Sequence, residues 1–528
     1  MHLDDWMTAA VGDARRRGLP ELEPLLHTLA EATRALRAAN WNLRADEAFD
    51  TRGGGSGTRE PPPLPASTTR TGLPDAGPAR APHLESIAQL SRLVRNGDVT
   101  SREVTEACLA AIAAGNPRFN AFITVTAALA LEQADRADRE RAGGHLRGPL
   151  HGIPVSLKDL IDLEGVPTTA ASRVRSGIVA RRDAPVTARL EAAGAVIVGK
   201  CNLHEFAFGT TNEESAYGPA RHPLDPTRSP GGSSGGSAAA VLAGMSAASV
   251  GTDTGGSIRI PAAACGLVGL TPTFGEVPCA GVVPLAASLD HVGPLARSVA
   301  DARLLLAAMR GDSPDRGQAN ACDPRGLRLG LPRGYFFDRL DPGVYREVEA
   351  AVARLRDAGV TVREVVVPHA ALIVPVYLHT VFAEAAAYHA ATLDARPGDY
   401  TPPVRLRLEA ARSVLAEDYV RAQRGREALR DGVDAALAGC HALVLPTLPI
   451  TAPPLGASTV PVGEGVEPVR AVTLRLTQLF NLTGHPAITM PAGEGVGGLP
   501  VGLQFVGWRH CTDALLDVAA ACEPAVRG

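Results

Sequence analysis

Aromatic residues are scarce in this sequence, and neither sign of charge predominates. Phe, Trp and Tyr make up 4% of the 528 residues, whereas hydrophobic residues make up 45%, so aliphatic side chains must supply most of any core. The 52 basic residues nearly balance the 56 acidic ones, which leaves a formal net charge of −4. That balance provides no electrostatic attraction to nucleic acid or to an anionic membrane surface. We expect neither as a partner.

Patterns typical of disulfides and metal sites are also lacking. The eight cysteines are scattered, and none forms a Cys-x-x-Cys pair or a Cys/His cluster with zinc spacing. We expect free thiols in a reducing compartment, no metal and no cofactor. No run reaches the roughly 18 apolar residues of a membrane-spanning helix, and the opening MHLDDWMTAAVGDARRR lacks the apolar segment of a signal peptide. These absences predict a cytoplasmic location.

The first 50 residues predict a helical hairpin. Apolar side chains recur at helical spacing over residues 3–17 and again from Leu22 to about Trp41, and Gly18-Leu19-Pro20 separates the two helices. Two helices alone cannot bury both apolar stripes. We therefore expect the hairpin (residues 1–50) to dock on the rest of the chain or on the second copy of a homodimer.

Composition changes abruptly over residues 51–82. Gly, Pro and Ser dominate there, so little apolar surface can be buried and the segment predicts a linker. Pro61 to Pro65 within it suits an extended spacer or, alternatively, a polyproline ligand. The linker separates the hairpin from residues 83–528, which form the main domain.

The main domain shows a succession of strand and helix patterns. Gly152–Leu160 alternates apolar residues as a strand does, which places Lys158 on the opposite face from Leu157. A helix from about Ala184 to Ala193 leads into the apolar run Ala195–Gly199. This succession predicts an α/β fold with helices on the faces of a sheet. Further strands are expected at residues 442–446, 487–490 and 501–506, with a helix-rich region over 312–439.

The most distinctive stretch runs from Ser229 to Gly269. Two Gly/Ser-rich loops, around Ser233 and Ser257, bracket a small-residue segment that can form a helix. A flexible linker would not carry that helix or the apolar residues after the second loop. The first loop also lacks the Gly-Lys-Ser/Thr ending of a phosphate-binding P-loop. Serines and free backbone N–H groups near a helix N-terminus suit the binding of an electrophile.

This stretch resembles the amidase signature, the hallmark of a family of serine amide hydrolases with a Ser–cisSer–Lys triad. The resemblance extends from about His83 to the C-terminus and implies one large domain in which helices cover a mixed central β-sheet. It implies Ser257 as the nucleophile, Ser233 as the bridging serine in a cis peptide, and Lys158 as the base. Ser234 is the alternative bridging serine. Some relatives have helical caps or small helical partner subunits, so the hairpin could instead bind a partner or gate the substrate.

A lysine must be uncharged to accept a proton. At an unperturbed pKa of about 10.4, only about one lysine in 2,500 is neutral at pH 7. Burial lowers the pKa of an amine, and a shift of about three units corresponds to roughly 4 kcal/mol. The alternative role for Lys158 is an ion pair with the neighbouring Asp159. Because the two serine loops follow Lys158 at the intervals of the family pattern, the role of base is favoured for Lys158.

The resemblance and the loop sequence also imply the remaining site residues. Glycines let backbone N–H groups turn towards a substrate oxygen, so the second loop is expected to supply an oxyanion hole. Its four residues are Thr254, Gly255, Gly256 and Ser257. Arg259 is either a contact for a substrate carboxylate or the buried partner of Asp253. In relatives the region 312–439 borders the pocket, so specificity is expected there and over Thr210–Tyr217.

The function expected from these features is metal-free hydrolysis of a small carboxamide, urea or carbamate through an acyl-serine intermediate. The alternative within the family is an amidotransferase A-type subunit that releases ammonia for tRNA-dependent transamidation. Thr271 and Glu276 stand where many relatives have a lysine and an arginine, which argues against that alternative. A binding protein that retains the fold without turnover is a third possibility, against which the complete triad argues.

Overall fold

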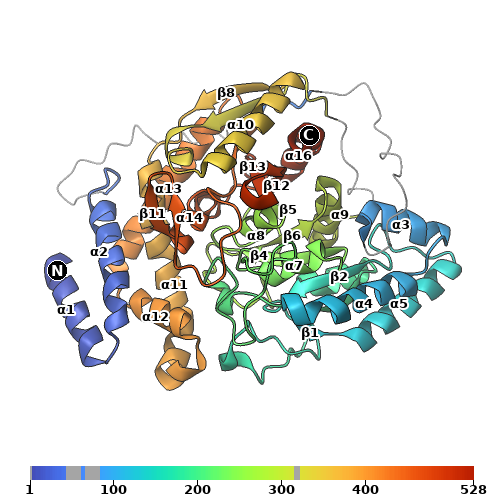
Figure 1. Cartoon of the computed structure of the whole chain (residues 1–528), viewed down its shortest axis with the longest axis horizontal. Coiled ribbons are helices and arrows are strands. Elements are labelled where there is room, and N and C mark those ends of the chain that lie inside the picture. Colours follow the sequence, from blue (N-terminus) through green and yellow to red (C-terminus); the bar gives the residue numbers. More distant parts are fainter. Residues whose placement is uncertain (1–2, 43–60, 66–83, 314–321) are drawn as a thin grey trace.

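A computed structural model of the chain describes residues 3–42, 61–65, 84–313 and 322–528 (Figure 1). The strands are β1 Phe122–Val125, β2 Pro154–Lys158, β3 Val196–Cys201, β4 Ala248–Asp253, β5 Val268–Thr271, β6 His291–Ala296, β7 Arg328–Pro332, β8 Thr361–Val365, β9 Ala442–Pro446, β10 Thr459–Val462, β11 Gly465–Pro468, β12 Ala487–Glu494 and β13 Pro500–Val506. Within the described residues, eleven of them form one sheet in the order β1-β3-β2-β4-β6-β5-β12-β13-β9-β7-β8. Pairing is parallel among β3, β2 and β4 and among β9, β7 and β8, and antiparallel elsewhere in this sheet. The mixed central sheet is confirmed.

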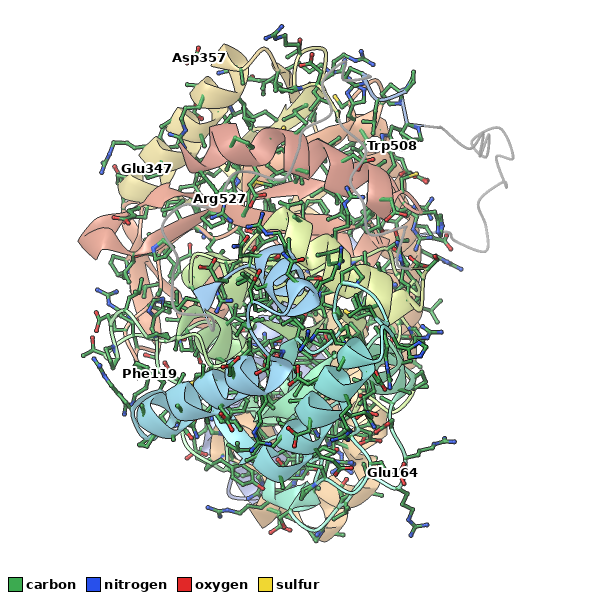
Figure 2. The ribbon with its side chains drawn as sticks, turned by 90° about the vertical axis from the view of Figure 1, so that its right-hand side faces the viewer. Phe119, Glu164, Glu347, Asp357, Trp508 and Arg527 are labelled. Carbon is green, nitrogen blue, oxygen red and sulfur yellow. The ribbon has the colours of Figure 1, made fainter. Side chains whose placement is uncertain are left out.

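Helices pack around this sheet. They are α1 Leu3–Arg16, α2 Glu23–Arg37, α3 Ile87–Asn96, α4 Ser101–Phe119, α5 Ala127–Ala142, α6 Pro185–Ala192, α7 Gly235–Leu242, α8 Arg259–Ala264, α9 Val299–Arg310, α10 Pro342–Asp357, α11 Ile373–Ala395, α12 Pro402–Ala411, α13 Ala416–Leu437, α14 Val469–Leu474, α15 Gln478–Thr483 and α16 Thr512–Arg527. α5 contacts β3, α7 contacts β4, and α8 and α16 contact β12 and β13. Figure 2 shows α4, ending at Phe119, and α10, carrying Glu347 and Asp357, towards opposite ends of the molecule.

Strands that read as apolar runs in the sequence lie close to their expected positions: β2, β3, β9, β12 and β13. β4, β5 and β6 were not expected. β4 has the sequence ASVGTD, whose small and polar residues do not alternate with apolar ones, yet every residue of it is buried between neighbouring strands. β7 and β8 lie in the region expected to be mostly helical, and they extend the sheet beyond β9.

The N-terminal hairpin packs on the main domain. α2 contacts α11, α12 and α13, and it ends at Arg37 rather than near Trp41. Most of the expected linker, and residues 43–50, lie outside the described residues. Pro61–Pro65 has no helix or strand, and the Nε2 atom of His441 lies 3.2 Å from the carbonyl oxygen of Pro63.

One helix corrects the expectation that no segment is long and apolar enough to span a membrane. Residues 370–395, which include α11, are long and apolar enough to cross a membrane by length and composition alone, with a mean hydropathy of 1.6 in the most apolar window. The sequence shows no uninterrupted apolar run there because His379, Glu384 and His389 interrupt it. α11 contacts α2, α12, α13 and α15, and such burial is typical of a core helix.

Candidate active site

The side chain of Lys158 reaches the first serine loop from the end of β2. Its Nζ atom lies 2.7 Å from Ser233 Oγ and 2.9 Å from Thr252 Oγ1. Lys158 and Ser233 are both fully buried. The peptide bond between Gly232 and Ser233 is cis. β2 and β4 are parallel neighbours, and this pairing brings Lys158 and Thr252 together although 94 positions separate them.

The environment of Lys158 favours the neutral amine. Burial lowers the pKa of Lys158 to about 7, and the more distant charges of Asp253 and Asp290 only partly oppose that effect. Asp159 does not pair with Lys158. Its carboxylate lies 3.1 Å from Lys200 Nζ, in a fully buried ion pair that the sequence did not suggest.

The two serine loops are joined through their backbones. The Ser234 amide donates to the Ser257 carbonyl oxygen at 3.2 Å, and Ser257 is 4% exposed. The hydroxyl of Ser234 donates to the Thr252 carbonyl oxygen at 3.2 Å, so Lys158 contacts Ser233 and not Ser234. Among the described residues, no hydrogen bond links the Ser233 and Ser257 hydroxyls.

Asp253, the last residue of β4, organises the second loop. Its carboxylate accepts hydrogen bonds from the amides of Gly256 at 2.6 Å and Ile258 at 3.1 Å. Burial by itself raises the pKa of Asp253, but Arg259 and these hydrogen bonds outweigh burial and hold the pKa well below its ordinary value. The carboxylate therefore stays charged and fixes the turn that carries Ser257.

Arg259 lies inside the protein and not on a pocket wall. Its guanidinium pairs with Asp253 at 3.2 Å and donates to Asn481 Oδ1 at 2.6 Å, and the side chain is 0% exposed. A substrate carboxylate has no access to a group so enclosed. The structure thus gives Arg259 the contacts of the buried-pair alternative, and the substrate-binding role is corrected on this ground.

One backbone amide of the proposed oxyanion loop already has a hydrogen-bond acceptor within the protein. Gly256 N–H donates to Asp253, whereas the amides of Thr254, Gly255 and Ser257 have no protein acceptor among the described residues. Free amides of this kind are what an oxyanion hole requires. The available donors are therefore reduced from four to three.

Close packing explains both glycines of this loop. A Cβ on Gly255 would lie 2.3 Å from Tyr377 Oη, and a Cβ on Gly256, whose φ is +138°, would lie 2.2 Å from Thr477 Oγ1. Larger residues would displace these neighbours. Tyr377 belongs to α11, so a helix from the region expected to border the pocket does reach the loop.

Asp290 supports the loop from behind. Its carboxylate accepts from Thr254 Oγ1 at 2.5 Å and from the Leu285 amide at 3.0 Å. Burial raises the pKa of Asp290 to about 6, against these hydrogen bonds. A cavity of about 10 Å³ lies beside Asp290, between Thr252 and Thr254, which is close to the space that one water molecule needs.

The two residues expected to contact substrate are placed differently. Thr210 is 4% exposed, lies against Gly232, and has a buried hydroxyl without a hydrogen-bond partner in the described structure. Tyr217 is 40% exposed. Thr210 is thus next to the first serine loop, whereas no contact links Tyr217 to that loop in the described residues.

Two arginines that sequence reasoning missed lie near the Phe208 ring. Arg407 and Arg470 are 5.7 and 5.5 Å from the centre of the Phe208 ring. Burial and the repulsion from Arg470 lower the pKa of Arg407 to about 10, and burial also lowers the pKa of Arg470. Within the described chain Arg470 has no carboxylate partner within 4 Å. No local pattern marks either residue, since both stand in ordinary helical segments.

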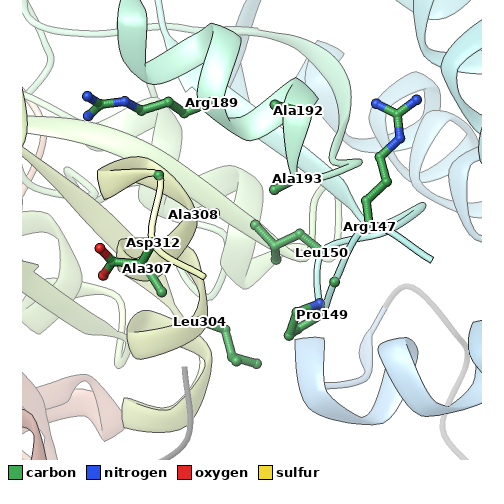
Figure 3. Close-up of a pocket in the computed structure, with 12 residues that line it drawn as sticks. Arg147, Pro149, Leu150, Arg189, Ala192, Ala193, Leu304, Ala307, Ala308 and Asp312 are labelled. Carbon is green, nitrogen blue, oxygen red and sulfur yellow. The ribbon is translucent and has the colours of Figure 1, made fainter. Parts of the chain in front are cut away.

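Larger cavities lie away from this cluster. One of about 210 Å³ opens between α6 and α9, with Leu150, Ala193 and Leu304 in its wall (Figure 3). Residues 147–150 and 192–193 precede β2 and β3, so this cavity is at the opposite ends of those strands from Lys158. Figure 3 shows Arg147 and Arg189 extending away from the apolar side chains. We assign it no role in the chemistry.

The described residues show no site suited to redox or metal chemistry. No disulfide joins cysteines in the described part of the chain, and burial raises the pKa of Cys265 above its ordinary value, which disfavours the reactive thiolate. No group of three or more His, Cys, Asp and Glu in the part that the structure describes could hold a metal ion.

Known proteins share both the sequence and the fold of this chain. The A-type subunit of a glutamyl-tRNA(Gln) amidotransferase from Chloroflexus aurantiacus is 41% identical over 477 residues, covering 84% of this chain and 96% of the relative. A crystal structure of an amidase is 37% identical with a TM-score of 0.79, covering 84% of this chain and all of the other. A native peptide amidase from Stenotrophomonas maltophilia is 33% identical with a TM-score of 0.70, over 84% and 97% of the two chains.

The sequence profile of one family spans most of the main domain. It is the Amidase family, and it matches residues 103–516, which include both serine loops and Lys158. The signature that the sequence displays, the mixed sheet and the similarity to solved amidases agree with this match. This chain belongs to the amidase family.

Proposed function

We propose that this chain hydrolyses the C–N bond of a carboxamide through an acyl-serine intermediate. The observation that carries the proposal is a fully buried amine, with a pKa near 7, lying 2.7 Å from the hydroxyl of Ser233. The backbone hydrogen bond between Ser234 and Ser257 holds the second serine next to the first. A buried amine of lowered pKa is a general base suited to neutral pH.

In the first half-reaction the Ser257 hydroxyl attacks the substrate carbonyl carbon. Its proton passes to Ser233 while the Ser233 proton passes to neutral Lys158, so one net proton moves to the amine. The negative charge that forms on the carbonyl oxygen is stabilised by the free loop amides. When the C–N bond breaks, Lys158 returns the proton through Ser233 to the leaving nitrogen, and ammonia or an amine departs.

The second half-reaction uses the same groups with water. A water molecule attacks the acyl carbon and gives up its proton to Ser233, which passes one to Lys158. The tetrahedral intermediate collapses, and the Ser257 oxygen leaves and regains a proton by the same route. The products are a carboxylic acid and the free enzyme.

The charge around the loop supports a substrate that carries a carboxylate. Arg470 is partly exposed and has no carboxylate within 4 Å in the described chain, although the more distant charge of Glu214 acts on it. It lies close enough to Tyr377 to influence the pKa of that phenol. A partly desolvated cation without a carboxylate at ion-pair distance is stabilised by an anionic ligand. We therefore favour carboxamides with an anionic group on the acyl side over neutral amides, ureas or carbamates.

A panel of amides tests this proposal. Ammonia or amine release is measured for dicarboxylic-acid monoamides, neutral carboxamides, anilides, ureas and carbamates, with the parent protein and with Ser257→Ala. We expect release from the monoamides by the parent and none above background by the variant. Unchanged release by Ser257→Ala would remove the nucleophile, and the absence of release from every compound would remove the hydrolase function.

The second candidate is an amidotransferase component that supplies ammonia to a partner. It is favoured by the relatives named as A-type subunits of glutamyl-tRNA(Gln) amidotransferases, two of which are 41% and 40% identical over 96% of their length. The sequence argument against it is weak, because Thr271 donates to Asp253 at 2.9 Å and Glu276 pairs with Arg310 at 2.6 Å. Both side chains are thus engaged by other residues of this chain. The identity of these two residues therefore says nothing about a partner subunit.

Glutamine turnover distinguishes the two candidates. A stand-alone hydrolase releases ammonia from its substrate at full rate as a purified single chain. A transamidase component is expected to release ammonia from glutamine slowly alone and at least about tenfold faster with its partner subunits. Full-rate turnover of another amide by the single chain would reject the second candidate.

A further inference from the structure

The described part of the N-terminal hairpin, residues 3–42, covers one side of α11. Figure 1 shows α2 beside α11 and α12, with α1 on the outer side of α2, and α2 contacts α11, α12 and α13. Leu29 and Leu36 of α2 are 1% and 0% exposed, and they belong to the same buried cluster as the main domain. The hairpin is therefore packed as part of the core.

Polar contacts tie the hairpin to particular residues of the domain. Thr33 Oγ1 lies 2.9 Å from His379 Nε2 on α11, and the other ring nitrogen of His379 lies 2.7 Å from the Pro375 carbonyl oxygen. Since a carbonyl only accepts, Nδ1 carries the proton and Nε2 accepts from the Thr33 hydroxyl, which shares its proton with the Leu29 carbonyl oxygen at 2.7 Å. Removing the Thr33 hydroxyl would leave Nε2 without its partner in the hairpin.

Two ion pairs fix the hairpin near the two ends of α2. Arg37 lies 2.7 Å from Asp418 on α13, and Arg17 lies 2.7 Å from Glu409 on α12. Both carboxylates belong to the main domain, and their side chains are 2% exposed. Both arginines belong to the hairpin. The domain therefore presents buried negative charge where the hairpin presents positive charge.

The same stretch of α11 also reaches the nucleophile loop. Tyr377 and His379 are two residues apart, so they point about 200° apart around the helix axis. Tyr377 lies against Gly255, and His379 meets Thr33. α11 is thus held between the hairpin on one side and the loop that carries Ser257 on the other.

We propose that the hairpin is a built-in positioning module that holds α11 so that Tyr377 lies against the nucleophile loop. Thr33 is its positioning residue and acts through His379. The family profile begins at residue 103, so the module lies outside the part of the chain that the family shares. The activity readouts below rest on the proposed amide hydrolysis, whereas the association readout does not.

The first test removes one hydroxyl. Thr33→Val keeps the shape of the side chain, and Thr28→Val is the matched control because Thr28 is exposed on the same helix and bonds the Pro24 carbonyl oxygen in the same way. We expect Thr33→Val to lower kcat by about threefold to tenfold, with KM shifted less, and Thr28→Val to change neither. A lower Tm with wild-type kcat and KM would overturn the proposal.

A double-mutant cycle tests the route through α11. If Thr33 acts by placing Tyr377, the loss caused by Thr33→Val is expected to shrink to less than about twofold in a Tyr377→Phe background. Independent, multiplicative losses in kcat would contradict that route. The Thr28→Val control in the same background is expected to have no effect.

The second test asks whether the module binds without its covalent link. A specific protease site replaces Gly53-Gly54-Gly55 in the full chain, which is folded, purified and then cut. We expect residues 1–53 to co-elute with the rest in size-exclusion chromatography, and Arg37→Ala combined with Arg17→Ala to release them. Release of the hairpin fragment from the cut parent protein would overturn the proposal, and this readout holds whether or not the substrate class is correct.

Discussion

Lys158 combines a buried position with a partner that can pass it a proton. Burial lowers the pKa of Lys158 to about 7, so roughly half of the amines are neutral at pH 7 instead of about one in 2,500. Thr252 and Ser233 satisfy its hydrogen bonds without adding charge next to it. A lysine on the surface would be almost entirely charged at pH 7, whereas this environment suits the role of base that we propose for Lys158.

The first prediction concerns pH. Since only neutral Lys158 accepts a proton, kcat/KM is expected to rise with pH and to reach half its plateau near pH 7. The profile is measured between pH 5 and 9 with a substrate whose charge does not change in that range. A flat profile with chemistry limiting would rule out Lys158 as the base.

Replacing Lys158 separates catalysis from folding. Lys158→Met is expected to abolish turnover, and it removes a group whose folded pKa lies below its unfolded pKa of about 10.4. Such a group destabilises the fold below pH 10.4, most strongly near pH 7 and lower. The variant is therefore expected to gain roughly 2–4 kcal/mol in unfolding free energy at pH 7, a gain that vanishes towards pH 10.5. Urea unfolding at both pH values measures it.

Arg470 gives the third residue-scale prediction. Arg470→Met is expected to lower kcat/KM for a carboxylate-bearing amide by about 10- to 100-fold, the value of a charge-assisted hydrogen bond. Its effect on the matching neutral amide is expected to be less than about twofold, since that substrate lacks the charge. Equal losses for both substrates would contradict a role in binding the carboxylate.

At the scale of elements, the turn from β4 into α8 depends on one buried ion pair. Asp253 closes β4, Arg259 opens α8, and the residues between them include the whole of the proposed oxyanion loop. The carboxylate holds the loop amides while the guanidinium compensates its charge. The shape of the loop therefore depends on two charged groups that are buried inside the protein.

Breaking this pair is expected to destabilise the protein. Arg259→Met leaves the charge of Asp253 buried and unpaired, which costs about 3–5 kcal/mol of unfolding free energy at pH 7. In the parent, Asp253 has a folded pKa below its ordinary value, so its stabilising effect is present above about pH 4 and is lost as pH falls further. The deficit of the variant is thus expected to shrink on acidification, and a constant deficit in urea unfolding would contradict this account.

At the scale of the whole molecule, the hairpin and the main domain share one core. Leu29 and Leu36 lie in the same buried cluster as β2 and α11 residues. A segment that is outside the family profile is thus bound by the same packing that holds the site together.

A cavity in that shared core is expected to affect the entire molecule. Leu36→Ala removes a fully buried side chain and is expected to lower the unfolding free energy by about 2–5 kcal/mol. Calorimetry is expected to show one transition at a lower temperature, because both parts unfold together. The half-buried Leu25 offers the control, since Leu25→Ala is expected to cost much less. A separate early transition for the hairpin would contradict a common core.

The resemblance to the amidase signature was enough to point to Lys158, Ser233 and Ser257. The structure brings Lys158 Nζ within 2.7 Å of Ser233 Oγ, and the catalytic roles of the three residues stay predictions. Strands with apolar runs were also predictable, because a strand that is buried on both faces has a continuous run of apolar residues. β4, whose small and polar residues are buried only by its neighbours, was not.

Sequence alone determined which chemical groups this protein carries and the family to which it belongs. Tertiary structure decided which of them meet: Thr252 with Lys158, Asp290 with Thr254, and Tyr377 with Gly255. It also decided that Arg259 is enclosed and that Arg470 lacks a carboxylate partner within the described chain. The physical reason is that a pKa, or the access of a substrate, depends on desolvation and charge contributed by residues far away in the chain.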